Sequence, residues 1–226
     1  MASTLGFAIS AADPSFENSI LSVVTSVCSK KAKKFRDAGF CLTVTHDKII
    51  DCVTSCVLLA RLSDILKWQK DLGHVYSNSL SPGIPWIVKV SVFTSIKELC
   101  PKINEGLKDS DQSAQHADIS SLVIELFNSL SPKVIDCISI VKIAQLCRSF
   151  SCSDQTCIYS VYVQVAASEC LQELTKLYSD LPEVPISKVP FKSELLHKWE
   201  IENNEQANSL MKNCIDMIAT VEQKSL

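Results

Sequence analysis

The sequence predicts an all-α protein whose helices stack in antiparallel pairs, the architecture of an α-solenoid. Apolar residues make up 46% of the 226 residues and recur at spacings of three and four, the period of one helix face. Only 5 glycines occur, and the Asn-Gly and Asp-Gly pairs typical of β-hairpins are absent. Each amphipathic helix must bury its stripe against a neighbour, which favours stacked pairs over the alternative, an irregular helical bundle.

Residues 1–76 are expected to form the first helix pair. Asp13 followed by proline is typical of a helix start, and an apolar stripe continues from there to about Lys33. A second helix is expected over residues 47–71, because its apolar residues also follow the helical period. Gly73 is expected to end this helix.

Residues 77–117 are expected to hold a loop, one helix and a linker. Two prolines and Gly83 mark the loop. Apolar residues at spacings of four, three, three and four predict a helix over 85–100, and Pro101 is expected to end or kink it. The polar residues 104–117 are expected to form the linker.

Residues 118–180 are expected to hold a further helix pair with an irregular insert at 146–162. The sequence CRSFSCSD near the start of the insert has no helical period, whereas the flanking segments do. A Ser-Pro pair is expected to end one helix and to start the next. The expected helices span residues 118–130, 131–145 and 161–178.

Residues 181–226 are expected to form a proline-rich connector followed by C-terminal helices. Pro182, Pro185 and Pro190 stiffen the connector. The last helical region, 191–221, is polar all round at its centre, so we expect it to break near Asn203-Asn204. The whole chain, 1–226, is thus predicted to be one helical array.

The 11 cysteines are an odd number, most of them lie in apolar runs, and no N-x-[ST] sequon occurs. We therefore expect reduced cysteines that act as small hydrophobic residues in a cytoplasmic protein. The net charge of −3 gives no attraction to nucleic acid, and no uncharged apolar run reaches the length of about 18 that a membrane span needs.

The pattern of polar residues predicts no catalytic residue, metal, cofactor or small-molecule substrate. The glycines are never closer than 10 residues, so they cannot build a phosphate-binding loop. The histidines are scattered, and Cys52 and Cys56 lie one helical turn apart, where packing explains them better than zinc. A helical enzyme with a Cys or Ser nucleophile stays open as an alternative, because its partners need not be close in sequence.

One cluster of basic residues and two tryptophans are candidates for contacts with other proteins. Lys30, Lys31, Lys33, Lys34 and Arg36 make up this basic cluster. It is a candidate localisation signal or contact for an acidic partner. The alternative is the solvated end of the first helix, where positive charge suits the helix dipole. Trp86 and Trp199 are candidate anchors, with packing as their alternative.

Several segments resemble HEAT repeats. Val88–Cys100 (VKVSVFTSIKELC) and Val163–Tyr178 (VQVAASECLQELTKLY) resemble second helices, and Ser131–Gln145 (SPKVIDCISIVKIAQ) resembles a matching first helix. Two more segments are Phe16–Phe40 (FENSILSVVTSVCSKKAKKFRDAGF) and Phe191–Ile218 (FKSELLHKWEIENNEQANSLMKNCIDMI). Together they resemble the C-terminal end of plant members of the proteasome adapter and scaffold family, which are very large HEAT-repeat proteins.

The resemblance implies a non-catalytic scaffold that binds the regulatory and core particles of the proteasome, in the cytoplasm and also in the nucleus. A HEAT-repeat scaffold for transport or trafficking is the alternative. The segment Leu146–Tyr162 departs from the family pattern, which joins paired helices by a short turn. We expect it to be an insertion translated from unspliced sequence. The apolar first helix further predicts a shortened form whose N-terminal face met a preceding repeat.

Overall fold

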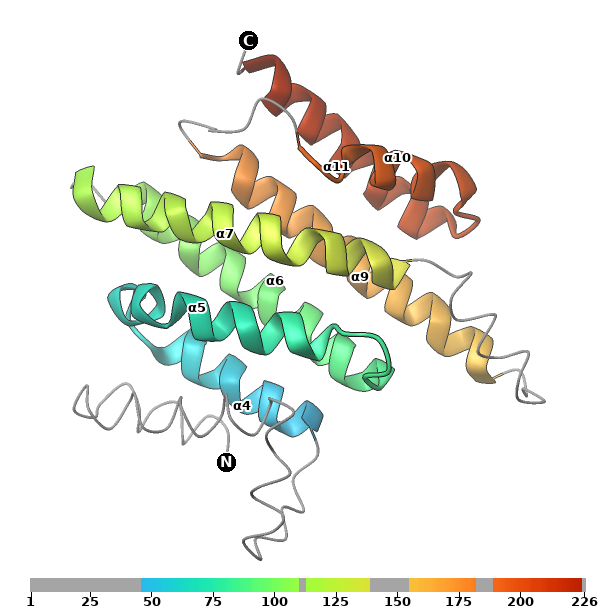
Figure 1. The fold of residues 1–226 in the computed structure, drawn as a ribbon, viewed down its shortest axis with the longest axis horizontal. Helices are drawn as coiled ribbons and strands as arrows, with labels where there is room; N and C mark the ends of the chain where they lie inside the picture. Colours follow the sequence, from blue (N-terminus) through green and yellow to red (C-terminus); the bar gives the residue numbers. More distant parts are fainter. Residues whose placement is uncertain (1–45, 110–112, 139–154, 182–188, 225–226) are drawn as a thin grey trace, which may run out of the picture. The chain divides into compact units, whose positions relative to one another are not determined.

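The structure, a computed structural model, describes residues 46–109, 113–138, 155–181 and 189–224. Within these ranges it holds seven α-helices and no strand, which confirms the all-helical prediction (Figure 1). The helices are α4 (His46–Leu59), α5 (Leu62–Ser79), α6 (Trp86–Asp109), α7 (Ser113–Ile138), α9 (Gln155–Ser179), α10 (Lys192–Ile201) and α11 (Glu205–Lys224). Two compact units divide the chain, unit 1 up to Leu122 and unit 2 from Val123.

In unit 1, α5 and α6 form an antiparallel hairpin. The hydroxyls of Tyr76 and Ser95 lie 2.8 Å apart in a buried hydrogen bond. Nearer the start of α5, Leu62 lies against Gly106. The start of α5 therefore lies beside the end of α6, and the end of α5 lies beside the start of α6. The two helices are antiparallel. Helix α6 also packs against α4, and the two run in the same direction (Figure 1).

The loop between α5 and α6 occupies residues 80–85, where proline and glycine predicted it. Gly83 has a φ of +83°, a conformation that favours glycine because it has no Cβ. The carbonyl of Pro85 then accepts hydrogen bonds from the backbone N–H groups of Val88 and Lys89, which starts α6.

In unit 2, α7 and α9 form a second antiparallel pair. The rings of Phe127 and Tyr178 stack with their centroids 4.1 Å apart. At the other end of the pair, the side-chain amide of Gln164 donates to the carbonyl of Ile138 at 3.0 Å. Phe191, just before α10, places its ring 5.1 Å from that of Phe127. Aromatic packing thus joins three segments that are far apart in the sequence.

Helices α9 and α11 run parallel, whereas α10 and α11 are antiparallel. Gln164 donates to Glu202 at 3.3 Å, and further along both helices Cys214 is hydrogen-bonded to Thr175. In both chain segments the second partner lies later in the sequence than the first, so α9 and α11 run in the same direction (Figure 1).

Between α10 and α11, partners instead move in opposite directions along the two helices. The indole N–H of Trp199 donates to Asn208 at 2.9 Å near the turn that joins them. Lys192, at the start of α10, pairs with Glu222 near the end of α11. The antiparallel hairpin α10/α11 is therefore closed by polar contacts at both of its ends.

The helix bounds correct three of the sequence predictions. The single helix expected over 47–71 is two helices, because the chain turns at Ala60 and Arg61. Gly73 does not end a helix but lies inside α5. Pro101 does not end a helix, which was one of the two effects expected of it: α6 continues to Asp109, because its buried apolar stripe runs through the proline from Ile96 to Ile103.

Proline likewise fails to divide α7. This helix passes through Pro132 without interruption, although two helices were expected there. An interior proline costs about 3 kcal/mol, and the buried residues on both sides of it, from Ile119 to Ile138, offset that cost. Residues 104–109 and 113–117, expected as a linker, are helical.

Other predictions are confirmed or lie outside the described residues. The C-terminal break is confirmed, since α10 ends at Ile201 and α11 begins at Glu205. Helix α9 covers the helix expected at 161–178 and begins earlier, so that residues 155–162 of the expected insert are helical. The first expected helix, residues 139–154 and the proline connector at 182–188 lie outside the described residues, and the single-array description of 1–226 stays a prediction.

Candidate functional site

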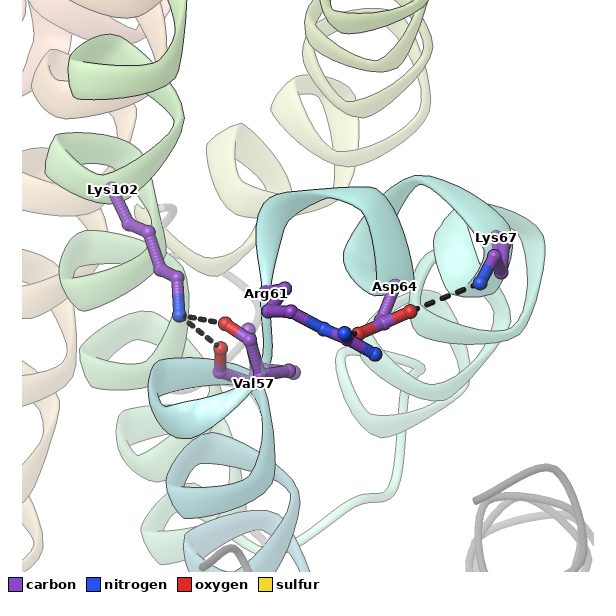
Figure 2. A network of polar contacts seen from close by, with 6 residues as sticks. Val57, Arg61, Asp64, Lys67 and Lys102 are labelled. Atoms are coloured by element: carbon purple, nitrogen blue, oxygen red, sulfur yellow. Dashed lines mark hydrogen bonds and ion pairs between the residues drawn. The ribbon is translucent and has the colours of Figure 1, made fainter. Parts of the chain in front are cut away.

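The corner between α4 and α5 is closed by a network of charged side chains. Lys102 of α6 points its ammonium at the last carbonyls of α4 (Figure 2). Its Nζ donates to the carbonyl oxygen of Val57 at 3.0 Å and of Leu58 at 2.5 Å, and it also donates to that of Ala60. The final carbonyls of a helix have no partner within the helix. Lys102 therefore caps α4 from a different helix, and its positive charge suits the dipole there.

Asp64 holds the other side of this corner, in the first turn of α5. Its carboxylate is buried and accepts from Arg61 Nε at 2.9 Å and from Lys67 Nζ at 3.0 Å (Figure 2). Burial raises the pKa of Asp64, but the hydrogen bonds from Lys67 and Arg61 outweigh burial and hold the pKa below its usual value. Burial likewise lowers the pKa of Lys102. These charges stabilise the turn rather than forming an open reactive site.

Two thiols lie one turn apart on α4. Cys56 is buried at 5% exposure, and Cys52 is half-buried at the edge of the same face. The two side chains are hydrogen-bonded to each other, which lowers the pKa of Cys52 to about 7 and raises that of Cys56. An accessible sulfur with a lowered pKa is a candidate nucleophile.

Large exposed apolar side chains gather at one end of unit 2. Val161 and Tyr162 on α9 are 43% and 60% exposed, and Ile201 at the end of α10 is 49% exposed. The hydrogen bond between Gln164 and Glu202 brings these two stretches of chain to the same end of the unit. We call Val161, Tyr162 and Ile201 the apolar end.

The structure places two of the residues predicted as contacts. Trp86 is 40% exposed at the start of α6, and its role as an anchor stays a prediction. Trp199 is half-buried, and its hydrogen bond with Asn208 gives it a packing role between α10 and α11. The basic cluster, Lys30 to Arg36, lies outside the described residues.

Over the described ranges, no group of three or more His, Cys, Asp or Glu side chains is placed to hold a metal ion. In the same part of the chain, no helix is long and apolar enough to cross a membrane.

Comparison with known proteins adds no relative: no family model, curated protein or solved structure matches the chain.

The sequence analysis assigned both thiols to packing and did not anticipate the difference between them in burial and in pKa. The signal was nevertheless present. A C-x-x-x-C pair on a helix places both sulfurs on one face, and Cys52 lies at the edge of the stripe that Ile50, Val53 and Cys56 define. An edge position exposes one thiol while burying its partner.

Proposed function

We propose that this chain is a non-catalytic scaffold of the HEAT type, which binds other proteins along its stacked helix pairs and has proteasome particles as its partner. The proposed sites of action are the cytoplasm and the nucleus. The partner and its compartments follow from the resemblance of the quoted segments to the proteasome adapter and scaffold family. The architecture has independent support from contacts within each unit.

The direction of successive helices is the observation that carries the proposal. In unit 2, the antiparallel pairs α7/α9 and α10/α11 place their second helices, α9 and α11, side by side and parallel. In unit 1, α6 closes the pair α5/α6 and lies parallel to the preceding helix, α4. A stack of helix hairpins produces this relation at every step, because each hairpin repeats the orientation of the last. The parallel helices also pack directly side by side, α9 with α11 and α4 with α6, which favours a stack over an irregular bundle.

The apolar end of unit 2 is the proposed contact surface. Protein interfaces are enriched in aromatic residues, and a few well-buried anchors supply most of their binding energy. Tyr162 has the largest exposed fraction of the exposed large apolar side chains of the described residues. Val161 and Ile201 add exposed aliphatic side chains at the same end of the unit.

Binding of the purified full chain to purified proteasome particles tests the proposal. Analytical ultracentrifugation with the regulatory particle, the core particle and their complex should show co-sedimentation. Tyr162→Asp and Ile201→Asp should each weaken binding by about 10-fold or more, as losing an anchor does. Leu59→Asp is the matched control, because Leu59 is equally apolar and 43% exposed but lies on α4.

Each negative result has a separate meaning. A wild-type chain that co-sediments with none of the three samples would overturn the proteasome as partner. Equal loss of binding in Leu59→Asp would overturn the assignment of the surface to the apolar end.

A further inference from the structure

The turn between α5 and α6, together with the first residues of α6, supports an inference that is independent of the proposed scaffold function. Four side chains there are apolar and exposed, and we call them the apolar tip: Pro82, Pro85, Trp86 and Ile87. The two largest, Trp86 and Ile87, are 40% and 45% exposed. Leu80 and Val88, on either side of the tip, are buried at 3% and 2% exposure. These two buried residues hold the ends of the segment, and the apolar tip faces outward.

No charged side chain interrupts this part of the chain. The 14 residues from Val75 to Val88 contain no Asp, Glu, Lys, Arg or His. Lys89 follows them directly and is half-buried, in the first turn of α6. The apolar tip can therefore leave water without desolvating a charge, while the long side chain of Lys89 can carry its ammonium toward a surface beside the tip.

The backbone of the turn is also suited to an apolar surrounding. The N–H of Ser81 donates to the carbonyl of Asn78 at 3.2 Å, and the N–H of Ile84 donates to the carbonyl of Ser81 at 3.3 Å. Pro82 and Pro85 carry no N–H. A backbone donor without a partner is costly in a lipid environment, and these four residues bring none.

The shape of the turn excludes one class of protein partner. Pro82 and Pro85 have the P-x-x-P spacing of ligands for proline-binding domains, which recognise an extended polyproline II helix with negative φ throughout. Gly83 has a φ of +83°, and the hydrogen bond from Ile84 to Ser81 curls the chain between the prolines. The apolar tip is therefore a compact, preformed projection, which loses little entropy on binding.

We propose that the apolar tip inserts into the interfacial layer of a phospholipid bilayer, with Trp86 and Ile87 as anchors and Lys89 beside the headgroup phosphates. Tryptophan is enriched in this layer, because its ring is apolar and its indole N–H is polar. A protein interface combines an apolar centre with a polar, hydrogen-bonding rim, whereas the 14 residues around this tip carry no charge, which suits lipid better.

Two anchoring side chains give weak and reversible binding. A single myristoyl chain binds bilayers with a constant of about 10⁴ M⁻¹, and it buries more apolar surface than the apolar tip does. We therefore expect half-maximal binding of the chain at about 1 mM lipid or above.

Flotation of the native full chain with vesicles of phosphatidylcholine, and with vesicles that also contain phosphatidylserine, tests the proposal. The chain should float with both at lipid concentrations above the expected midpoint. In vesicles with brominated acyl chains, the bromine atoms should quench part of the tryptophan fluorescence. Trp86→Phe keeps an apolar ring, so this variant should still float but should lose the quenching, because Trp68 is buried at 3% exposure and Trp199 is held between α10 and α11.

Three substitutions locate the contact on the apolar tip. Ile87→Asp places a charge among the anchors and should weaken binding by about 10-fold or more. Leu59→Asp is the matched control, because Leu59 is 43% exposed but lies on α4, and this variant should bind as the wild type does. Lys89→Gln should weaken binding to the anionic vesicles by about 5-fold and leave binding to the neutral vesicles unchanged. Circular dichroism shows whether each variant is folded.

Three results would overturn the proposal. The first is a folded wild-type chain that floats with neither kind of vesicle. The second is quenching that persists in Trp86→Phe, and the third is an equal loss of binding in Ile87→Asp and Leu59→Asp. If Ile87→Asp impairs co-sedimentation with proteasome particles while the wild type binds no vesicle, the apolar tip belongs to a protein interface instead. The vesicle assays contain no proteasome, so the two proposals fail independently.

Discussion

Substitution of two buried tyrosines by phenylalanine should change stability in opposite directions. Tyr178 and Tyr76 are both buried, at 1% and 0% exposure. The hydroxyl of Tyr76 shares a 2.8 Å hydrogen bond with Ser95, whereas that of Tyr178 is enclosed and has no hydrogen-bond partner among the residues that the structure describes. Substitution by phenylalanine therefore removes a hydrogen-bonded hydroxyl at Tyr76 and a hydroxyl without a hydrogen bond at Tyr178.

The magnitudes follow from the cost of burying a polar group. An enclosed hydroxyl without a partner destabilises the folded state by about 1–3 kcal/mol. Its removal leaves a small cavity, which is itself destabilising and cancels part of the gain. Tyr178→Phe keeps the ring stacked on Phe127 and should raise the free energy of unfolding by about 1 kcal/mol. Tyr76→Phe should lower it by about 1–2 kcal/mol, because Ser95 loses its partner.

Urea unfolding of the full-length variants, followed by circular dichroism, measures both changes. The two variants should differ by about 2 kcal/mol or more, with the wild type between them. If Tyr178→Phe destabilises the protein as much as Tyr76→Phe does, the hydroxyl of Tyr178 has a partner and the reasoning is refuted. Tyr178→Leu is the control for packing and should destabilise the protein, because it removes the ring from the stack with Phe127.

Three further predictions use the same unfolding assay. Gly73→Ala should stabilise α5 by about 0.5–1 kcal/mol, because a Cβ there meets no atom of the structure within 4 Å. Gly106→Ala should stabilise α6 by less, because its Cβ would displace the end of the Leu62 side chain; equal effects would contradict this. Asp64→Asn should lower stability at pH 7 by about 1 kcal/mol, and the difference from wild type should shrink as the pH falls through the lowered pKa of Asp64, since the carboxylate stabilises the folded chain only while it is ionised. Asn208→Ala should lower the free energy of unfolding by about 2 kcal/mol, because the Asn208 amide accepts a hydrogen bond from the indole of Trp199 and donates one to the backbone carbonyl of Trp199. A change below about 0.5 kcal/mol would contradict this prediction.

Apolar spacing predicted the helices but not where they end. Buried residues continue at intervals of three and four from Ile50 through Ala60 and Asp64 to Ser79, so the turn between α4 and α5 leaves no gap in the pattern. The prolines at 101 and 132 led to the opposite error. Local proline rules predicted an end or a kink at Pro101 and a new helix at Pro132, but one helix and its buried stripe pass each position. Packing over a whole helix outweighed one lost hydrogen bond.

The C-terminal break was predictable because its signal is local. Residues around Asn203-Asn204 are polar all round, and the structure uses them as a turn in which Asn204 accepts a hydrogen bond from the backbone N–H of Ala207. The lowered pKa of the Cys52 thiol was only partly predictable. Its spacing is visible in the sequence, but the difference in burial between Cys52 and Cys56 depends on the packing of α4 against its neighbours.

The cap on α4 has a consequence for synthesis of the chain. Lys102, which satisfies the end of α4, is translated 42 residues after Ala60. Until then, a nascent chain holds an unbroken helical pattern with no stop signal, and we expect one long helix to compete with the native corner. Once α6 has formed, Lys102 can cap α4 and stabilise the turn between α4 and α5. Ribosomes that pause before residue 102 should therefore carry a chain whose first corner is still unmade.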